Sequence, residues 1–122
     1  MNFYKLFLLS LIVFVFNNNA FAADAAKGKK LFTKCKACHN TDAPKHKVGP
    51  HLVGIVGRKS GSAEGYTKYS KALKESGIEW NEANLDKWLT NPKAMVKGTK
   101  MIYPGLKKAE DRAALIEYLK TK

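Results

Sequence analysis

Both cysteines of this chain lie in the stretch KCKACHN, residues 34–40, and a histidine directly follows the second cysteine. Two thiols and an imidazole at this spacing could form a disulfide, a redox-active dithiol, half of a zinc site or the attachment point of a haem. A disulfide between Cys35 and Cys38 would close a very short loop, so it would stabilise the fold only slightly. A structural cross-link is therefore a poor explanation for this pair.

Zinc and dithiol chemistry also fit the chain poorly. A structural zinc ion needs four ligands, and the only candidates beside the cysteines are His39, His46 and His51. His39 adjoins Cys38 and can hardly reach the same tetrahedron. A redox dithiol normally lies between a strand and a helix, whereas this motif follows a helical pattern. A histidine directly after the second cysteine is typical of a haem held by two thioether bonds, so the motif predicts one covalently bound haem c.

The iron of such a haem has a second axial position, opposite His39. Four side chains could fill it: Met95, Met101, His46 and His51. A thioether opposite a histidine raises the reduction potential and suits electron transfer, whereas an open position suits ligand binding or peroxide chemistry. Met95 is expected to fill core space. Met101 lies in a glycine-containing loop, far enough along the chain to reach the opposite face of a haem.

Helices joined by long loops are expected to position these residues. Helical patterns cover residues 23–38, 69–76, 81–92 and 108–122. Asp24 and Asn81 are the expected N-caps, and Pro92 is expected to end the third helix, before a loop over 91–105. No segment alternates as a strand. The prediction is a small single-domain all-α fold, with about four to five helices and long loops wrapped around one haem.

The N-terminus has the pattern of a secretory signal. Lys5 precedes an apolar run of 11 residues, Leu6 to Phe16, and small residues follow at Ala20 and Ala22. A run of this length is too short to cross a bilayer, which needs about 20 residues. We expect residues 1–22 to be a cleaved signal peptide and residues 23–122 to form the domain. The mature protein would then be periplasmic, with no stable membrane insertion.

The chain is strongly basic. It has 22 lysines and arginines against 10 acidic residues, a formal charge of +12, and loss of Lys5 lowers this to +11. Such a charge favours acidic partners. Export argues against nucleic acid as the partner, and only two basic residues, Arg58 and Arg112, are arginines. The aromatic and basic residues also lack the alternation found in single-strand binders.

Several separate motifs, in order, resemble the class I c-type cytochromes, especially mitochondrial cytochrome c and its soluble bacterial relatives. These are GKKLFTKCKACH, HKVGPHLVGIVGRKSGSAEG, GIEW, LTNPKAMVKGTKMIYPG and RAALIEYLK. The resemblance implies the cytochrome c fold. It also implies that Cys35 and Cys38 bind the haem, with His39 as the proximal iron ligand and Met101 as the distal one.

Further residues correspond to positions around the haem in this family. The resemblance implies that the Pro50 carbonyl accepts a hydrogen bond from His39. It places Arg58, Trp80 and Thr99 around the haem propionates, and makes His46 a histidine that bridges two loops. Three features depart from the mitochondrial pattern: Lys97 replaces a proline, Trp88 replaces a tyrosine, and the stretch GYTKYSKA has one additional residue.

The expected function is that of a soluble monomeric monohaem protein, not an enzyme, that carries one electron between membrane redox complexes. The donor would be of the bc1 type and the acceptor a terminal oxidase or similar complex. The alternative is a peroxidase-like or gas-binding haem protein with an open iron position. Lysines near the presumed haem edge would bind acidic docking faces; these are Lys34, Lys47, Lys93, Lys97, Lys100, Lys107 and Lys108.

Overall fold

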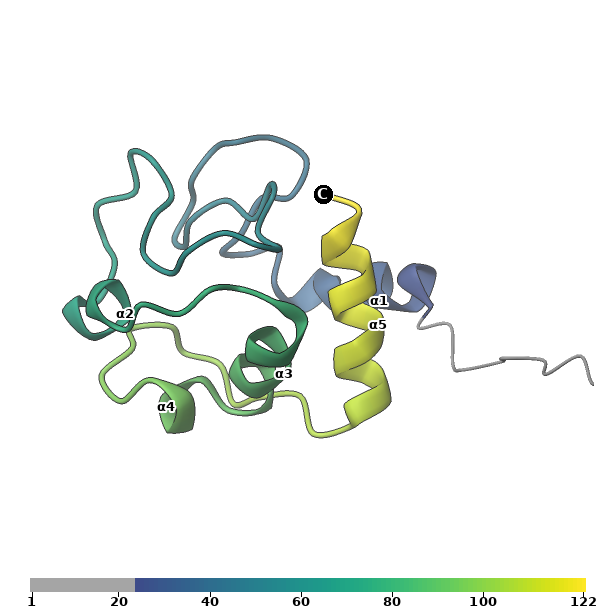
Figure 1. The fold of residues 1–122 in the computed structure, drawn as a ribbon. Coiled ribbons are helices and arrows are strands. Elements are labelled where there is room, and N and C mark those ends of the chain that lie inside the picture. The colour runs from purple at the N-terminus through teal and green to yellow at the C-terminus, as the bar shows by residue number, and fades with distance from the viewer. Residues whose placement is uncertain (1–23) are drawn as a thin grey trace, which may run out of the picture.

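The computed structural model describes residues 24–122, and within them the fold is all-α, as predicted (Figure 1). The expected signal peptide lies outside the described residues. The elements are α1 (Ala25–Leu31), the short 3-10 helix η1 (Phe32–Lys34), α2 (Lys71–Glu75), α3 (Glu82–Thr90), α4 (Pro92–Met95) and α5 (Ala109–Lys120). Lys59 and Glu79 form an isolated β-bridge. Within the described part of the chain, no helix is long and apolar enough to span a membrane.

The helix starts follow from local hydrogen bonding. The Asp24 side chain accepts a hydrogen bond from the Ala26 N–H at the start of α1, and Asn81 caps α3 in the same way. The expectation for Pro92 was wrong in part. α3 ends before it, at Thr90, but Pro92 then begins α4 because proline at the first helical position lacks only an N–H that would be unpaired anyway.

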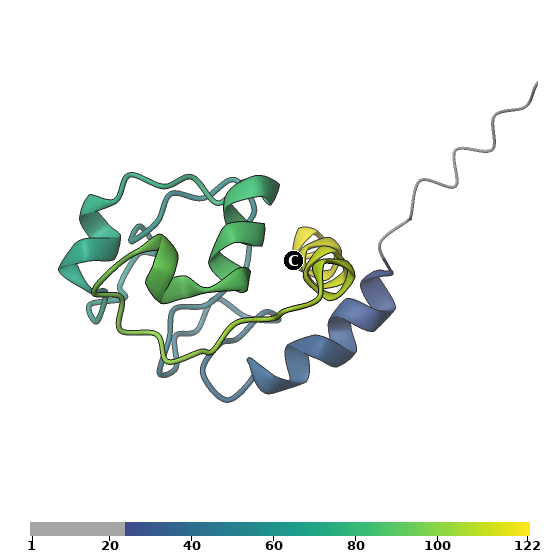
Figure 2. The ribbon, with the colours of Figure 1, turned by 90° about the horizontal axis from the view of Figure 1, so that it is seen from below.

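α1 and α5 cross in close contact (Figures 1 and 2). Gly28 permits this approach, since a Cβ there would lie 2.7 Å from the Tyr118 Cβ and would overlap the Ala114 carbonyl. Phe32 packs on Tyr118 with ring centroids 5.4 Å apart. An ion pair of 2.7 Å between Lys27 and Asp111 also joins the two helices.

α3 packs on α5 and turns its apolar face inward. Leu85, Trp88 and Leu89 are buried in one cluster with Leu115 and other residues of α5. Residues of the loop 36–70 and of the segment 99–103 lie opposite this face. These elements surround a cavity between them.

Candidate functional site

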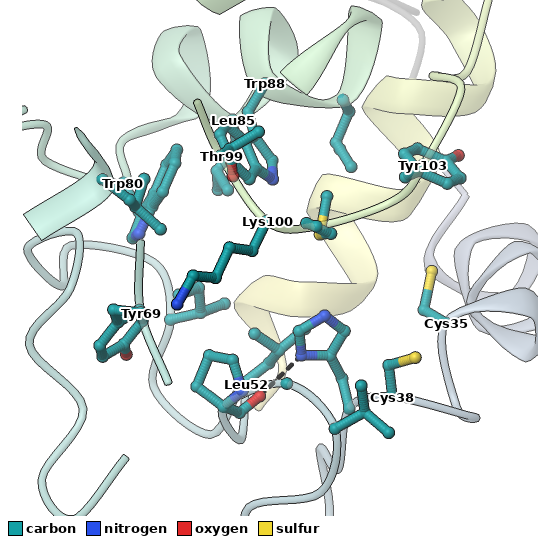
Figure 3. A pocket seen from close by; sticks show the side chains of 18 of the residues that line it. Cys35, Cys38, Leu52, Tyr69, Trp80, Leu85, Trp88, Thr99, Lys100 and Tyr103 are labelled. Carbon is teal, nitrogen blue, oxygen red and sulfur yellow. Dashed lines mark hydrogen bonds between the residues drawn. The ribbon is translucent and has the colours of Figure 1, made fainter. Parts of the chain in front are cut away.

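All eight predicted site residues line one cavity of about 500 Å³ (Figure 3). They are Cys35, Cys38, His39, Pro50, Arg58, Trp80, Thr99 and Met101. Most of the remaining wall is apolar and comes from loops as well as from α3 and α5. A cavity of this size, with a mainly apolar wall and few polar groups, is typical of a cofactor site.

A single turn of chain after η1 brings the cysteines and the histidine to the same wall. The backbone N–H groups of Cys38 and His39 both donate to the Cys35 carbonyl, at 3.1 and 2.9 Å. The two thiols are free. Burial raises the pKa of the Cys35 thiol, and the neighbouring Cys38 adds to this shift. A thiol with a raised pKa is a poor redox nucleophile, so the pair suits covalent attachment better than dithiol chemistry.

His39 is held in one orientation. Its Nδ1 lies 2.7 Å from the Pro50 carbonyl oxygen, which can only accept, so Nδ1 carries the proton (Figure 3). Burial lowers the pKa of His39, and the Arg58 charge acts in the same direction. The ring is therefore neutral at pH 7, and its Nε2 has a lone pair for a metal. Gly49 packs against the ring, since a Cβ there would lie 2.8 Å from Nδ1.

Among the four candidates for the second axial position, Met101 alone is found in the wall of this cavity. Met95, on α4, packs against the core cluster without lining the cavity. His46 instead bridges two loops, because its Nε2 bonds the Glu64 carbonyl at 2.7 Å. His51 stacks on His46 with ring centroids 5.0 Å apart. The site thus contains one imidazole and one thioether.

Arg58 brings a half-buried cation to the wall. One guanidinium nitrogen donates to the His51 carbonyl at 2.9 Å and another to the Val53 carbonyl at 3.4 Å. Its Nε is buried and has no partner among the described residues. Burial lowers the pKa of Arg58. A buried N–H normally has an acceptor, and a haem carboxylate entering the cavity would supply one. The residues present therefore fit haem.

Trp80 and Trp88 form an edge-to-face pair with ring centroids 5.1 Å apart. Both indole nitrogens face the cavity (Figure 3). Trp88 lies on α3 and is 8% exposed. It occupies the position for which the family resemblance implies a tyrosine, so the wall has an N–H donor there in place of a hydroxyl group.

Sequence reasoning did not assign two wall residues, Lys68 and Tyr69. The Tyr69 hydroxyl accepts a hydrogen bond from the Ala63 N–H at 3.1 Å. Both residues belong to a polar loop without helical or strand periodicity, so no pattern indicated their direction. Of the seven lysines expected near the haem edge, Lys34 and Lys100 line the cavity and the other five do not.

Known proteins resemble this chain along almost all of its described length. The family model of cytochrome c matches residues 25–122. Cytochrome c-554 of Methylosinus trichosporium is 52% identical over 99 residues, which cover 80% of this chain and 74% of that protein. Cytochrome c2 of Rhodomicrobium vannielii is 49% identical and covers 88% of this chain and 86% of its own. Among solved structures, cytochrome cH of Methylobacterium extorquens superposes with a TM-score of 0.77 at 51% identity, over 81% of this chain and 99% of that one.

Proposed function

The chain belongs to the cytochrome c family, and from this premise we propose that it carries single electrons from a bc1-type donor to a terminal oxidase or similar acceptor. As a member of the family it holds one covalently bound haem c and acts as a monohaem electron carrier. The observation that supports the proposal most is that His39 and Met101 line the same mainly apolar cavity. A histidine and a thioether on the iron suit electron transfer.

The residues of the cavity have separate tasks in this proposal. Cys35 and Cys38 would hold the haem through thioether bonds, and His39 and Met101 would bind its iron. The Pro50 carbonyl keeps the proton on Nδ1 of His39, which leaves the lone pair of Nε2 available to bind the metal. When bound, the haem supplies an iron that gains and loses one electron. The mainly apolar wall would exclude water, and a site in which His39 and Met101 both bind the iron would rearrange little when the iron changes charge.

The mouth of the cavity suits docking to an acidic redox protein. Val48 and Ile102 line the cavity and are also the large hydrophobic residues exposed in the described chain, at 68% and 92%. Lys34 and Lys100 line the cavity beside them. Exposed apolar residues together with lysines favour a partner with an apolar patch and acidic surroundings. We propose that the protein makes such contacts as a monomer.

The site of action proposed here is the periplasm. The positive start, the short apolar run and the small residues before Ala23 support export with cleavage after Ala22. N-terminal sequencing of protein from its native compartment should begin at Ala23 or within a residue or two of it. An intact Met1 in a membrane fraction would contradict this part of the proposal.

Optical and mass spectra of the purified protein test the proposed function. The intact mass should equal mature chain plus one haem, and acid–acetone should not extract the haem. The oxidised protein should show a sulfur-to-iron charge-transfer band, and the reduced protein should not bind added carbon monoxide rapidly. Fast binding of carbon monoxide or rapid reaction with peroxide would instead support the alternative, an open iron position.

A further inference from the structure

The cavity has two chemically different ends. Cys35 and Cys38 lie at one end, and Tyr69 and Trp80 lie at the other (Figure 3). The charged residues of the described wall are Lys34, Arg58, Lys68 and Lys100, and this wall includes no Asp or Glu. The cavity therefore carries positive charge that no carboxylate among its described lining residues balances.

The covalent attachment decides which part of the haem meets each end. Haem bears its vinyl groups and its propionate carboxylates on opposite edges of the porphyrin. The vinyl groups form the thioether bonds to Cys35 and Cys38. The two carboxylates must then face the far end of the cavity, where Tyr69 and Trp80 lie (Figure 3).

That far end offers several hydrogen-bond donors. Arg58 lies beside Trp80, whose backbone N–H donates to the Arg58 carbonyl at 2.8 Å, and the buried Nε of Arg58 has no partner in the described chain. The Tyr69 oxygen already accepts from the Ala63 N–H, so its own hydrogen can point to another acceptor. The Trp80 indole N–H faces the cavity (Figure 3). Lys68 adjoins Tyr69 in the chain and also lines the cavity.

We propose that Lys68 is a further haem-binding residue, whose ammonium pairs with a haem carboxylate and raises the reduction potential. Lys68 is exposed and forms no ion pair or side-chain hydrogen bond with another described residue. Its replacement therefore removes no interaction that supports the fold. Its neighbour Tyr69, fixed by the bond to Ala63, holds the backbone of Lys68 at the edge of the cavity.

Lys68 can be tested separately from the other lysines of the wall. Lys34 adjoins Cys35, and Lys100 adjoins Met101, so that changes at either would disturb residues that bind the haem. Lys100 also reaches toward Tyr69 (Figure 3), which adds to the positive charge at that end. Lys74 is a matched control for Lys68, since it is an exposed lysine on the nearby α2 but does not line the cavity.

The expected effect follows from electrostatics. Reduction adds negative charge to the haem, so a nearby cation favours the reduced state and raises the midpoint potential. Lys68→Gln should lower the potential of the holoprotein, and Lys68→Glu should lower it by about twice as much because the charge change doubles. Lys68→Arg should leave it close to that of the wild type, since it keeps the charge. Lys74→Gln should shift it much less than Lys68→Gln does.

The experiment is spectroelectrochemical titration of the wild type and these variants at pH 7, in about 0.01 and about 1 M NaCl. Screening shortens the Debye length from ~30 to ~3 Å over this range. The shift in midpoint potential caused by Lys68→Gln should persist in part at high salt, because salt screens a direct ion pair incompletely. The shift caused by Lys74→Gln should vanish. Equal shifts for Lys68→Gln and Lys74→Gln, or a Lys68→Arg shift as large as that of Lys68→Gln, would overturn the inference.

This inference rests on the proposed function, because it needs the haem in this cavity. The two can fail separately. A wild-type mass without one covalently attached haem would overturn the proposed function. A wild type with its haem and a reversible one-electron couple, but with no shift in Lys68→Gln, would overturn only the role of Lys68.

Discussion

At the scale of single residues, the site combines reactive groups with residues that hold them in place. His39 could bind a metal through either ring nitrogen, and its bond to the Pro50 carbonyl leaves only Nε2 available. Gly49 contributes by its lack of a side chain, because any Cβ would press on the imidazole. The reactivity of the histidine therefore depends on two neighbours that have no chemistry of their own.

Met101 and Met95 provide a test of axial ligation at this scale. Both are half-buried, but only Met101 lines the cavity. Met101→Leu keeps the volume of the side chain and removes the sulfur. We expect it to abolish the sulfur-to-iron charge-transfer band of the oxidised protein and to lower the reduction potential. Met95→Leu is the control and should leave both unchanged; loss of the band in this variant instead would show that Met95 is the ligand.

At the scale of elements, the contact between α1 and α5 positions the cysteine motif. Both cysteines directly follow α1 and η1, so a shift of α1 against α5 would move the haem attachment point. Gly28 fixes how closely the two helices approach. In an isolated helix alanine would be preferred over glycine by about 0.8–1.0 kcal/mol. The residue at this position is therefore determined by packing against α5.

Gly28→Ala should destabilise the holoprotein despite the better helix propensity of alanine. The new Cβ would lie 2.7 Å from the Tyr118 Cβ and would overlap backbone atoms of Ala114, which cannot move without shifting α5. We expect a loss of about 1–3 kcal/mol in the free energy of unfolding, measured with guanidinium chloride. Lys30→Ala, at an exposed position of α1, should change it by less than about 0.5 kcal/mol. Equal stability of the two variants would contradict this account of the contact.

The loop around His51 should make stability depend on pH. Burial lowers the pKa of His51 from its ordinary value of 6.5, and the charges of Arg58 and His46 act in the same direction. Below that ordinary value the unfolded chain binds a proton that the folded chain resists, so stability falls as the pH decreases from 7 to 5. His51→Asn keeps an acceptor for the Val53 N–H and removes the titration. The free energy of unfolding, measured from pH 8 to 5, should fall less steeply for this variant than for the wild type. The same pH dependence in both proteins would contradict the role of His51.

The sequence predicted the position of the cysteine motif better than it predicted the loop that surrounds the cavity. Spacing alone predicted that Cys35, Cys38 and His39 act together, and a local turn is enough to bring them to one wall. Lys68 and Tyr69 were not assigned, since their loop is shaped by distant bonds such as that between the Ser60 N–H and the Ile78 carbonyl. α4 was missed because proline is compatible both with the end of one helix and with the start of the next.

At the scale of the whole molecule, most of the acidic residues are already paired with lysine or arginine elsewhere in the fold. Six of the ten form ion pairs within the fold: Asp42, Glu75, Glu82, Asp86, Asp111 and Glu117. None of the acidic residues of the described chain lines the cavity. The excess of lysine near the cavity mouth is therefore not neutralised locally, and it remains available to attract an acidic partner.

Lys97 tests whether this charge forms a docking face. It is exposed and lies close to Thr99 and Met101 in the chain. Lys87 is the control, because it is exposed on the side of α3 opposite the cavity-facing Leu85 and Trp88. Lys122 is unsuitable as a control, since its ion pair with Asp42 would be lost as well.

The rate of electron transfer to a purified acidic oxidase should fall steeply as salt shortens the Debye length from ~30 Å at 0.01 M to ~10 Å at 0.1 M. At low salt, Lys97→Glu should slow it several-fold more than Lys87→Glu, and the difference should disappear at high salt, because steering acts through unscreened charge near the contact. Equal rates for the two variants at every salt concentration would mean that the charge acts diffusely and that the cavity mouth is not the docking face.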